Sequence, residues 1–359
     1  MSRLTPYLGI VAALATGVII AIFSGGLDVG YNSEAVITPS AIFPPTVTGS
    51  VTATSSRVTA VSDKKAPLAQ ASVVSESSVR NITAELDVSA KSLRDALVNI
   101  ICSAPVKSKI HSISGSGVFI DSKGIILTNA HIGQYFLMAD RGVSCVIRSG
   151  SPAVAHYKAS IIYISPVWIQ TNPNVLTQTN AIGNGEYDFA LLAVSGSAVS
   201  NDIVPSSFPY LPLATFPPPT GAPVAIASYG AQFLASDQIQ SGLFPTIVFG
   251  SVKEVFTFGT NTIDVLALGG SYAAQEGSSG GGVVDTSGAL VGTITTSTVS
   301  GTTDTRSLDA ITASYIRAQY ASETGHALDI LLTKPTKISV ADFAPKIPAL
   351  ESIITAQLP

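Results

Sequence analysis

From Ser112 to Thr312 the chain is a succession of short runs rich in β-branched and apolar residues, each bounded by glycine, proline, serine or asparagine. Such runs are typical of antiparallel strands joined by turns. A proline-rich break from Pro205 to Pro219 contains three consecutive prolines, which forbid regular structure, and it divides the runs into two groups. Two groups of about six strands predict an all-β fold of two six-stranded antiparallel barrels, because closure removes exposed edges.

The predicted strands fall on either side of the proline-rich break. Those of the first group are 116–120, 125–128, 143–148, 153–164 and 189–194. Those of the second group are 224–228, 246–255, 262–268, 281–284, 289–296 and 308–312. These groups place the first barrel at about 105–204 and the second at about 205–313, in a folded domain spanning 85–333.

Two stretches have the 3.6-residue spacing of a helix instead. Leu93, Leu97, Ile100 and Ile101 predict an entry helix over 89–102 that packs outside the barrel, with Ser89 as its N-cap. A dimerising or membrane-surface helix is the alternative. A second helix is expected at 314–333, with a break near glycine 325 and a short tail at 334–359.

Tyr7 to Leu27 is uncharged and apolar, and as a helix these residues would reach roughly 30 Å, the thickness of a bilayer's hydrocarbon core. Arg3 precedes the segment, and no further Lys or Arg occurs before Arg57. The positive-inside rule then predicts a cytoplasmic tip at 1–6, a transmembrane anchor at 7–27 and an extracytoplasmic remainder. A cleaved signal peptide is the alternative, and both readings export the folded domain.

Residues 28–84 are rich in Ser, Thr, Ala, Val and Pro and show no sustained period. A segment with so little to bury predicts a flexible tether between the anchor and the folded domain. One or two edge strands within 47–61 are the alternative reading.

The charge pattern excludes some classes of function. The net charge is −4 and no basic run exceeds Lys64-Lys65, which argues against nucleic-acid binding. The two cysteines, Cys102 and Cys145, form no CxxC motif or His/Cys cluster, so no metal site is predicted.

The most informative loop is Gln275 to Asp285, in which Ser279 lies among four glycines and is followed by strand-forming valines. Glycine allows a tight backbone that brings N–H groups close to a ligand. A nucleophilic serine needs such N–H donors where negative charge develops on a carbonyl oxygen.

Two upstream segments supply possible partners for this serine. Ser114 to Asp121 and the following strand lead into the sequence TNAH, which ends at His131. The sequence YDFALL contains Asp188 and begins a second apolar strand. Histidine, aspartate and serine thus occur in that order along the chain.

These segments resemble the trypsin-like serine peptidases, which carry His, Asp and Ser in the same order at similar separations. TNAH, YDFALL and GSSGGG are similar to motifs of the bacterial HtrA-type branch, and the resemblance extends over about 110–316. The tail at 334–359 is too short for the PDZ module that HtrA-type enzymes often carry, so we do not expect regulation through such a module. The resemblance implies no metal or organic cofactor, and its partners would be protein or peptide substrates.

The resemblance implies a role for each residue. Ser279 would be the nucleophile, His131 the general base and later acid, and Asp188 the group that orients the imidazole. The N–H groups of Gly277 and Ser279 would form the oxyanion hole. His111, His156 and His326 lack comparable flanks and are interpreted as surface or packing residues.

Two other readings of the same motif remain. Residues 277–281 also fit the GxSxG elbow of α/β hydrolases, but three glycines and two valines after Ser279 are a poor start for the helix which that fold requires. A catalytically silent binding protein on the trypsin-like fold is the second alternative. The intact set of three residues argues against it.

The specificity pocket is predicted by alignment with the family. Ala273 would form its base, and Thr295, Thr296 and Ser297 one wall. A base without a carboxylate argues against Arg or Lys at the cleaved position and favours small or medium apolar residues. Ser278 occupies the place of the aspartate that pairs with a new N-terminus in trypsin, so activation by that ion pair is not expected.

Cys102 and Cys145 lie in a domain that we expect to be exported, where disulfides persist. A disulfide between them would join the entry helix to the first barrel. Two buried free thiols are the alternative.

Overall fold

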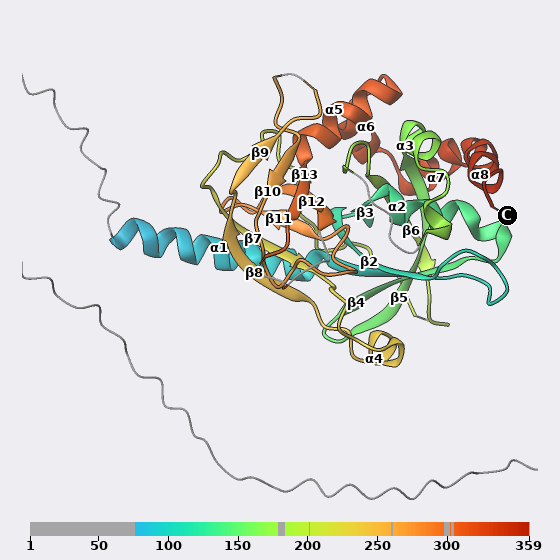
Figure 1. The fold of residues 1–359 in the computed structure, drawn as a ribbon, viewed down its shortest axis with the longest axis horizontal. Helices are drawn as coiled ribbons and strands as arrows, with labels where there is room; N and C mark the ends of the chain where they lie inside the picture. Colours follow the sequence, from blue (N-terminus) through green and yellow to red (C-terminus); the bar gives the residue numbers. More distant parts are fainter. Residues whose placement is uncertain are drawn as a thin grey trace, which may run out of the picture. The chain divides into compact units, whose positions relative to one another are not determined.

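The computed structural model describes residues 76–178, 184–200, 202–259, 261–297, 302 and 305–358 (Figure 1). The predicted cytoplasmic tip at 1–6, the anchor at 7–27 and the tether over 28–75 lie outside these residues. Among the helices within the described ranges, none has the length and apolarity needed to cross a bilayer.

The first group of strands forms a closed six-stranded antiparallel barrel, as predicted, in the order β1-β2-β3-β6-β5-β4. Its strands are β1 (Leu97–Ser103), β2 (Ile113–Asp121), β3 (Ile125–Thr128), β4 (Ser144–Gly150), β5 (Ala153–Ile164) and β6 (Ala190–Ser197). The first three residues of the shortest strand, Ile125, Ile126 and Leu127, are fully buried. Because such a strand packs on both of its faces, its sequence does not alternate between apolar and polar residues.

The entry helix differs from its prediction. Helix α1 spans Glu76–Ala96, so it takes in residues 76–84 of the predicted tether and ends before Leu97. Leu86, Ala90 and Leu93 are buried at helical spacing, whereas Ser89 lies inside the helix and is not its N-cap. Helix α1 packs on β2 of the barrel and on two strands of the second sheet.

Residues 97–102 were predicted as helix and are instead most of strand β1. Ile100 pairs with Gly115 on β2 and with Ile147 on β4, so β1 supplies the strand that closes the barrel. The apolar residues Leu97, Val98, Ile100 and Ile101 fit a helical pattern equally well, and periodicity alone does not separate a short buried strand from a buried helix.

The second group of strands forms a seven-stranded sheet in the order β8-β7-β11-β12-β13-β10-β9, not the predicted six-stranded barrel. Its strands are β7 (Pro223–Ser228), β8 (Thr246–Ser251), β9 (Glu254–Phe256), β10 (Val265–Ala267), β11 (Gly282–Val284), β12 (Leu290–Ser297) and β13 (Leu308–Thr312). The sequence pattern predicted β8 and β9 as one strand over 246–255. Val252 and Lys253 interrupt it, because their N–H groups donate to Ala222 and Ala267 outside the β7–β8 ladder.

The proline-rich crossing is fixed to both halves by backbone hydrogen bonds. The N–H of Phe208 donates to the carbonyl of Ser122 on the barrel side, and the N–H of Leu290 donates to the carbonyl of Pro212 on the sheet side. Phe208 also packs on Phe119, with ring centroids 4.7 Å apart. A segment without regular structure is therefore firmly attached at each end.

The remaining elements are helices. The predicted helix at 314–333 is two helices separated at Gly325, which has a φ of 73°, and the tail beyond it contains two more. These four are α5 (Ala313–Thr324), α6 (Leu328–Thr333), α7 (Thr336–Phe343) and α8 (Ile347–Thr355), with the 3-10 helix η3 (Ala344–Lys346) before α8. Shorter elements are α2 (Ala130–Gly133), η1 (Gln134–Arg141), α3 (Pro166–Thr171), η2 (Val175–Thr177) and α4 (Ser236–Ser241). Figure 1 shows α7 and α8 on the side of the first barrel, where α7 packs on β5.

Candidate active site

Neighbouring strands of the barrel bring His131 and Asp188 together. Strands β3 and β6 are antiparallel, and Thr128 at the end of β3 pairs with Ala190 at the start of β6. The residues that follow β3 and precede β6 therefore lie at the same edge. His131 Nδ1 is 2.8 Å from Asp188 Oδ2, and the backbone N–H of His131 donates to Asp188 Oδ1 at 2.9 Å. Both carboxylate oxygens thus contact one histidine.

A third donor comes from the second sheet. Thr295 Oγ1 donates to Asp188 Oδ2 at 2.8 Å, and Asn129 Nδ2 donates to the backbone carbonyl of Asp188 at 2.9 Å. The Asp188 side chain is 8% exposed and that of His131 is 21% exposed. A carboxylate with several donors around it is held in one orientation, and this one presents Oδ2 to the imidazole.

The loop that carries Ser279 is tied to β2 of the barrel. The N–H of Ser116 donates to the carbonyl of Ser279 at 2.7 Å, and Ser116 Oγ donates to the carbonyl of Gly277 at 2.8 Å. Ser116 Oγ also accepts from the N–H of Tyr229 at 2.8 Å, and Thr128 Oγ1 donates to the carbonyl of Ser116 at 2.7 Å. One buried serine thereby connects β2, the Ser279 loop and the end of β7.

Ser279 is partly exposed, and within the described chain no hydrogen bond joins its hydroxyl to His131. The structure therefore brings His131 and Asp188 into direct contact and holds the Ser279 backbone against β2. Hydrogen bonds of a nucleophile are often long before substrate binds, so this arrangement is compatible with a triad.

The turn around Ser279 requires glycine. Gly277 and Gly280 have φ values of 88° and 84°, a region that other residues rarely adopt. A Cβ at Gly280 would also collide with the carbonyl oxygen of Ser116. In this turn the N–H of Ser278 donates to Gln275 and that of Gly280 to Ile294, whereas those of Gly277 and Ser279 donate to no acceptor among the described residues. Two N–H groups are thus available beside the Ser279 hydroxyl.

The predicted pocket residues do not share one role. Ala273 is fully buried, and Thr295 turns its hydroxyl to Asp188. The side chains of Thr296 and Ser297 lie outside the described part of the structure. Strand β12 has a register shift between Ile294 and Thr296. A bulge of this kind redirects a side chain, and sequence alternation does not reveal it.

Two residues near the site were not singled out from the sequence. Ser116 lies in the SGSG segment at 114–117, where its small side chain and glycine neighbours are the only signal. Arg306 is 6% exposed, and its Nη1 donates to the carbonyl of Ala274 at 2.9 Å. A buried guanidinium therefore lies next to Ala273, the predicted pocket base.

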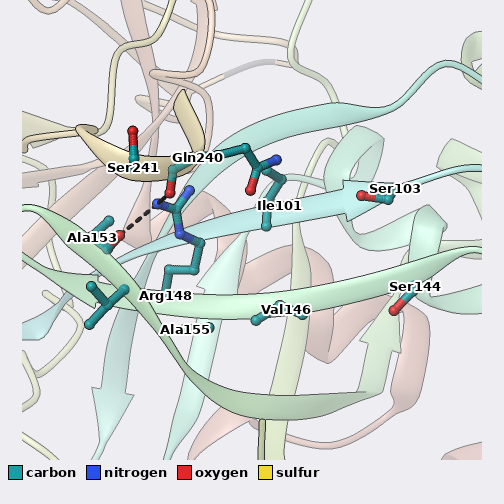
Figure 2. Close-up of a pocket in the computed structure, with 10 residues that line it drawn as sticks. Ile101, Ser103, Ser144, Val146, Arg148, Ala153, Ala155, Gln240 and Ser241 are labelled. Carbon is teal, nitrogen blue, oxygen red and sulfur yellow. Dashed lines mark hydrogen bonds between the residues drawn. The ribbon is translucent and has the colours of Figure 1, made fainter. Parts of the chain in front are cut away.

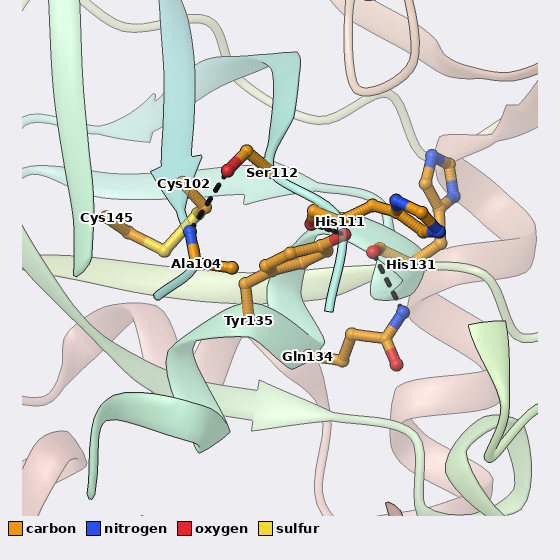
Figure 3. Close-up of a disulfide and its surroundings, with 8 residues drawn as sticks. All are labelled: Cys102, Ala104, His111, Ser112, His131, Gln134, Tyr135 and Cys145. Atoms are coloured by element: carbon orange, nitrogen blue, oxygen red, sulfur yellow. Dashed lines mark hydrogen bonds between the residues drawn. A yellow bond between two sulfur atoms is a disulfide. The ribbon is translucent and has the colours of Figure 1, made fainter. Parts of the chain in front are cut away.

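The disulfide between Cys102 and Cys145 is present (Figure 3). The two residues are directly opposite each other on β1 and β4, so the bond joins adjacent barrel strands and not the entry helix. The same view shows Gln134 Nε2 donating to the carbonyl of His131 at 3.0 Å. Among the described residues no group of His, Cys, Asp or Glu could hold a metal ion.

A cavity of about 360 Å³ lies between β1, β4, β5 and α4 (Figure 2). Arg148 lines it and is 4% exposed. Its guanidinium donates to the carbonyls of Ala153, Ile239 and Gln240, and so fixes α4 to the barrel. Burial lowers the pKa of Arg148 from its ordinary value. None of His131, Asp188 and Ser279 lines this cavity.

Comparison with known proteins identifies the family. Residues 115–292 match the family model described as the trypsin-like peptidase domain. The chain therefore carries a trypsin-like peptidase domain, the domain of serine-type hydrolases of peptide bonds. No curated protein gave a match.

Solved structures with a similar fold include the Rv3671c protease of M. tuberculosis. Its active form is 18% identical over 74% of this chain and 96% of that chain, with a TM-score of 0.42. Its inactive form is 19% identical over 67% of this chain and 96% of that chain, also with a TM-score of 0.42.

Proposed function

We propose that this peptidase is an endopeptidase in which His131, Asp188 and Ser279 form the catalytic triad. The observation that carries the proposal is the Asp188 carboxylate, which accepts from His131 Nδ1 and Thr295 Oγ1 at 2.8 Å each. That arrangement fixes the tautomer in which Nε2 of His131 is free to accept a proton.

The chemistry follows from these positions. Ser279 Oγ attacks the scissile carbonyl while His131 Nε2 takes its proton, and Asp188 stabilises the imidazolium that forms. The two available N–H groups, of Gly277 and Ser279, would bind the oxyanion of the tetrahedral intermediate. His131 then protonates the leaving amine, and water hydrolyses the acyl-enzyme by the same steps in reverse order.

Labelling with a fluorophosphonate probe tests the nucleophile. The wild type should be labelled, and Ser279→Ala should lose both labelling and peptidase activity, to less than about a thousandth of the wild-type rate. Ser278→Ala is a matched control, because Ser278 is the preceding serine and its hydroxyl contacts Ser228 at 3.2 Å. Labelling that persists in Ser279→Ala, or a folded wild type that is never labelled, would contradict the triad; the second result would favour a silent binding protein.

We also propose that the enzyme prefers small or medium apolar residues at the cleaved position. Ala273 at the predicted base carries no charge, so no carboxylate there would compensate the charge of an Arg or Lys side chain. A series of peptides that differ only at the cleaved position would test this. A strong preference for Arg or Lys would overturn the pocket assignment.

The proposed location is outside the cytoplasm, with residues 7–27 as a membrane anchor and exported proteins as substrates. The apolar segment and the absence of Lys and Arg between it and Arg57 support this, and so does the Cys102–Cys145 bond. Fractionation of cells that express the full chain should recover it with membranes, and protease added outside the inner membrane should digest it. Protection from that protease in cells whose inner membrane is intact would contradict export.

A further inference from the structure

Helix α5 contacts the Asp188 loop through Tyr315, by a hydroxyl group and by a ring whose centroid is 6.5 Å from that of Tyr187. Thr312 caps the helix, since its Oγ1 accepts from the N–H of Tyr315 at 3.1 Å. This cap places Tyr315 in the first turn, where it is 4% exposed. Tyr315 Oη accepts from the backbone N–H of Tyr187 at 3.0 Å. Tyr187 is the residue immediately before Asp188.

The backbone at Tyr187 needs such a partner. Its φ is 56°, in the left-handed region that costs a bulky residue roughly 1–2 kcal/mol. The turn around it is tight, because the N–H of Asp188 donates to Gly185 at 3.1 Å and that of Phe189 donates to the carbonyl of Tyr187 at 2.8 Å. A strained turn persists only where surrounding contacts hold it.

Tyr315 is itself held in place. Phe258 packs edge-on against its ring, with centroids 5.1 Å apart. The N–H of Phe258 donates to Asp264 Oδ2 at 2.8 Å, and Asp264 is 4% exposed. Burial raises the pKa of Tyr315 above its ordinary value, so the phenol stays neutral at any working pH. A chain of fixed contacts thus leads from the second sheet to the residue before Asp188.

We propose that Tyr315 is a positioning residue, whose hydroxyl holds the strained turn at Tyr187 and thereby aims the Asp188 carboxylate at His131. This inference rests on the proposed triad, because it assigns Tyr315 a role through Asp188. The helix that follows the last strand then serves catalysis as well as packing.

Tyr315→Phe tests the proposal, since it removes one oxygen and keeps the ring that packs on Phe258. Loss of one neutral hydrogen bond changes a rate by about three- to tenfold, so kcat should fall by that factor while KM stays within about twofold. The rate of fluorophosphonate inactivation, measured on folded enzyme with titrated active sites, should fall in parallel.

Tyr320→Phe is the matched control. Tyr320 is a second buried tyrosine on α5, 7% exposed, and its ring packs on Tyr163 at 4.8 Å and not on the Asp188 loop. This variant should keep the wild-type kcat and show a thermal unfolding midpoint comparable to that of Tyr315→Phe. Phe258→Leu loosens Tyr315 without removing its oxygen, and should lower kcat about twofold.

Ser279→Ala is measured beside these variants. If it retains activity, the proposed triad fails. If it is inactive while Tyr315→Phe and Phe258→Leu both keep the wild-type kcat per active site, the triad stands and the role of Tyr315 is overturned. An equal fall of kcat in Tyr315→Phe and Tyr320→Phe would also overturn it, because the effect would then be a general loss of packing.

Discussion

The first barrel and the second sheet supply different parts of one site and are built differently. The barrel has strands of up to 12 residues, and a fully buried strand, β3, leads to His131. Strands β10 and β11 of the second sheet have three residues each, and the Ser279 loop precedes β11. Side chains fill the barrel, whereas glycines next to Ser279 let backbones approach closely. Gly281, for example, has no room for a Cβ because the backbone carbonyl oxygen of Ala227 on β7 lies 2.5 Å from that position.

Because of this difference, we expect changes in the barrel and changes in the Ser279 loop to affect different properties, the first stability and the second the catalytic rate. Long apolar strands bury large side chains, so changes in the barrel should lower the free energy of unfolding. The Ser279 loop buries little apolar surface and depends on backbone geometry, so changes there should lower the rate per folded molecule. The four changes below test that division.

Gly280→Ala should have the largest effect. An added methyl would meet the carbonyl of Ser116 and displace the Ser279 backbone, and misplacement by about 1 Å can cost roughly 100-fold in rate. Peptidase activity per folded molecule should fall at least that far. Gly221→Ala is the control, because Gly221 has the same sign of φ, 86°, with no atom within 4 Å of its Cβ position. Equal losses in the two variants would mean that φ strain, and not the close approach to β2, is decisive.

Ile147→Ala should be the largest change in stability. Ile147 lies on β4, is fully buried and pairs with Ile100 on β1. Truncation in such a core costs about 2–4 kcal/mol, measured as the free energy of unfolding in denaturant. Activity per active site should stay near that of the wild type. Val154→Ala, at a 50% exposed position of β5, should change the unfolding free energy by less than about 0.5 kcal/mol. A fall in kcat for Ile147→Ala would show that the barrel core tunes the site.

The same contrast explains what the sequence could predict. Strands β3, β5 and β13 were predicted with their observed ends, because alternation or uninterrupted apolar runs between turn residues identify them. The partnership of His131 and Asp188 was predicted from family motifs, and His131 Nδ1 lies 2.8 Å from Asp188 Oδ2. Strand β1 was missed because Leu97 to Ile101 suits a helix equally well.

Other features depend on contacts that have no local signature. The break between β8 and β9 depends on hydrogen bonds of Val252 and Lys253 to distant residues. The hydroxyl of Thr295 reaches Asp188 because of a bulge in β12, and Tyr315 reaches Tyr187 across 128 positions of sequence. Alternation and spacing report neither kind of contact.

Thr295→Val tests the contact between the two halves, because Thr295 of the second sheet donates to Asp188, which precedes β6 of the barrel. Valine keeps the shape and removes the donor to Asp188, and a lost hydrogen bond to a charged group costs about 1.5 kcal/mol, or roughly tenfold in kcat. Steady-state kinetics with one peptide substrate would measure it. Thr295→Ser retains the hydroxyl and should recover most of the rate. If serine and valine gave the same loss, the methyl group and not the hydrogen bond would be responsible.

The smallest expected effect is a loss of stability at alkaline pH. It is measured by comparing a buried tyrosine near the barrel with one near the second sheet. Tyr135 of η1 donates to the carbonyl of His111, and Tyr229, after β7, donates to that of Gly150, at 2.8 Å each. Burial raises the pKa of Tyr135 from 10.0 to about 12. Burial likewise raises the pKa of Tyr229 to about 12, against a smaller opposing effect of its hydrogen bond to Gly150.

A raised pKa in the folded state means that the unfolded chain loses the proton first. This contribution to the free energy of unfolding is fully present below pH 10 and is lost as the pH rises through about 12. Near pH 11 the loss is about 1 kcal/mol per group. Denaturant unfolding across this range should show the decline, and Tyr135→Phe and Tyr229→Phe should each flatten it. If the two flatten it equally, barrel and sheet unfold as one cooperative unit. A decline that only Tyr135→Phe flattens would mean that the sheet opens before the barrel, and unfolding independent of pH in the wild type would contradict the burial of both phenols.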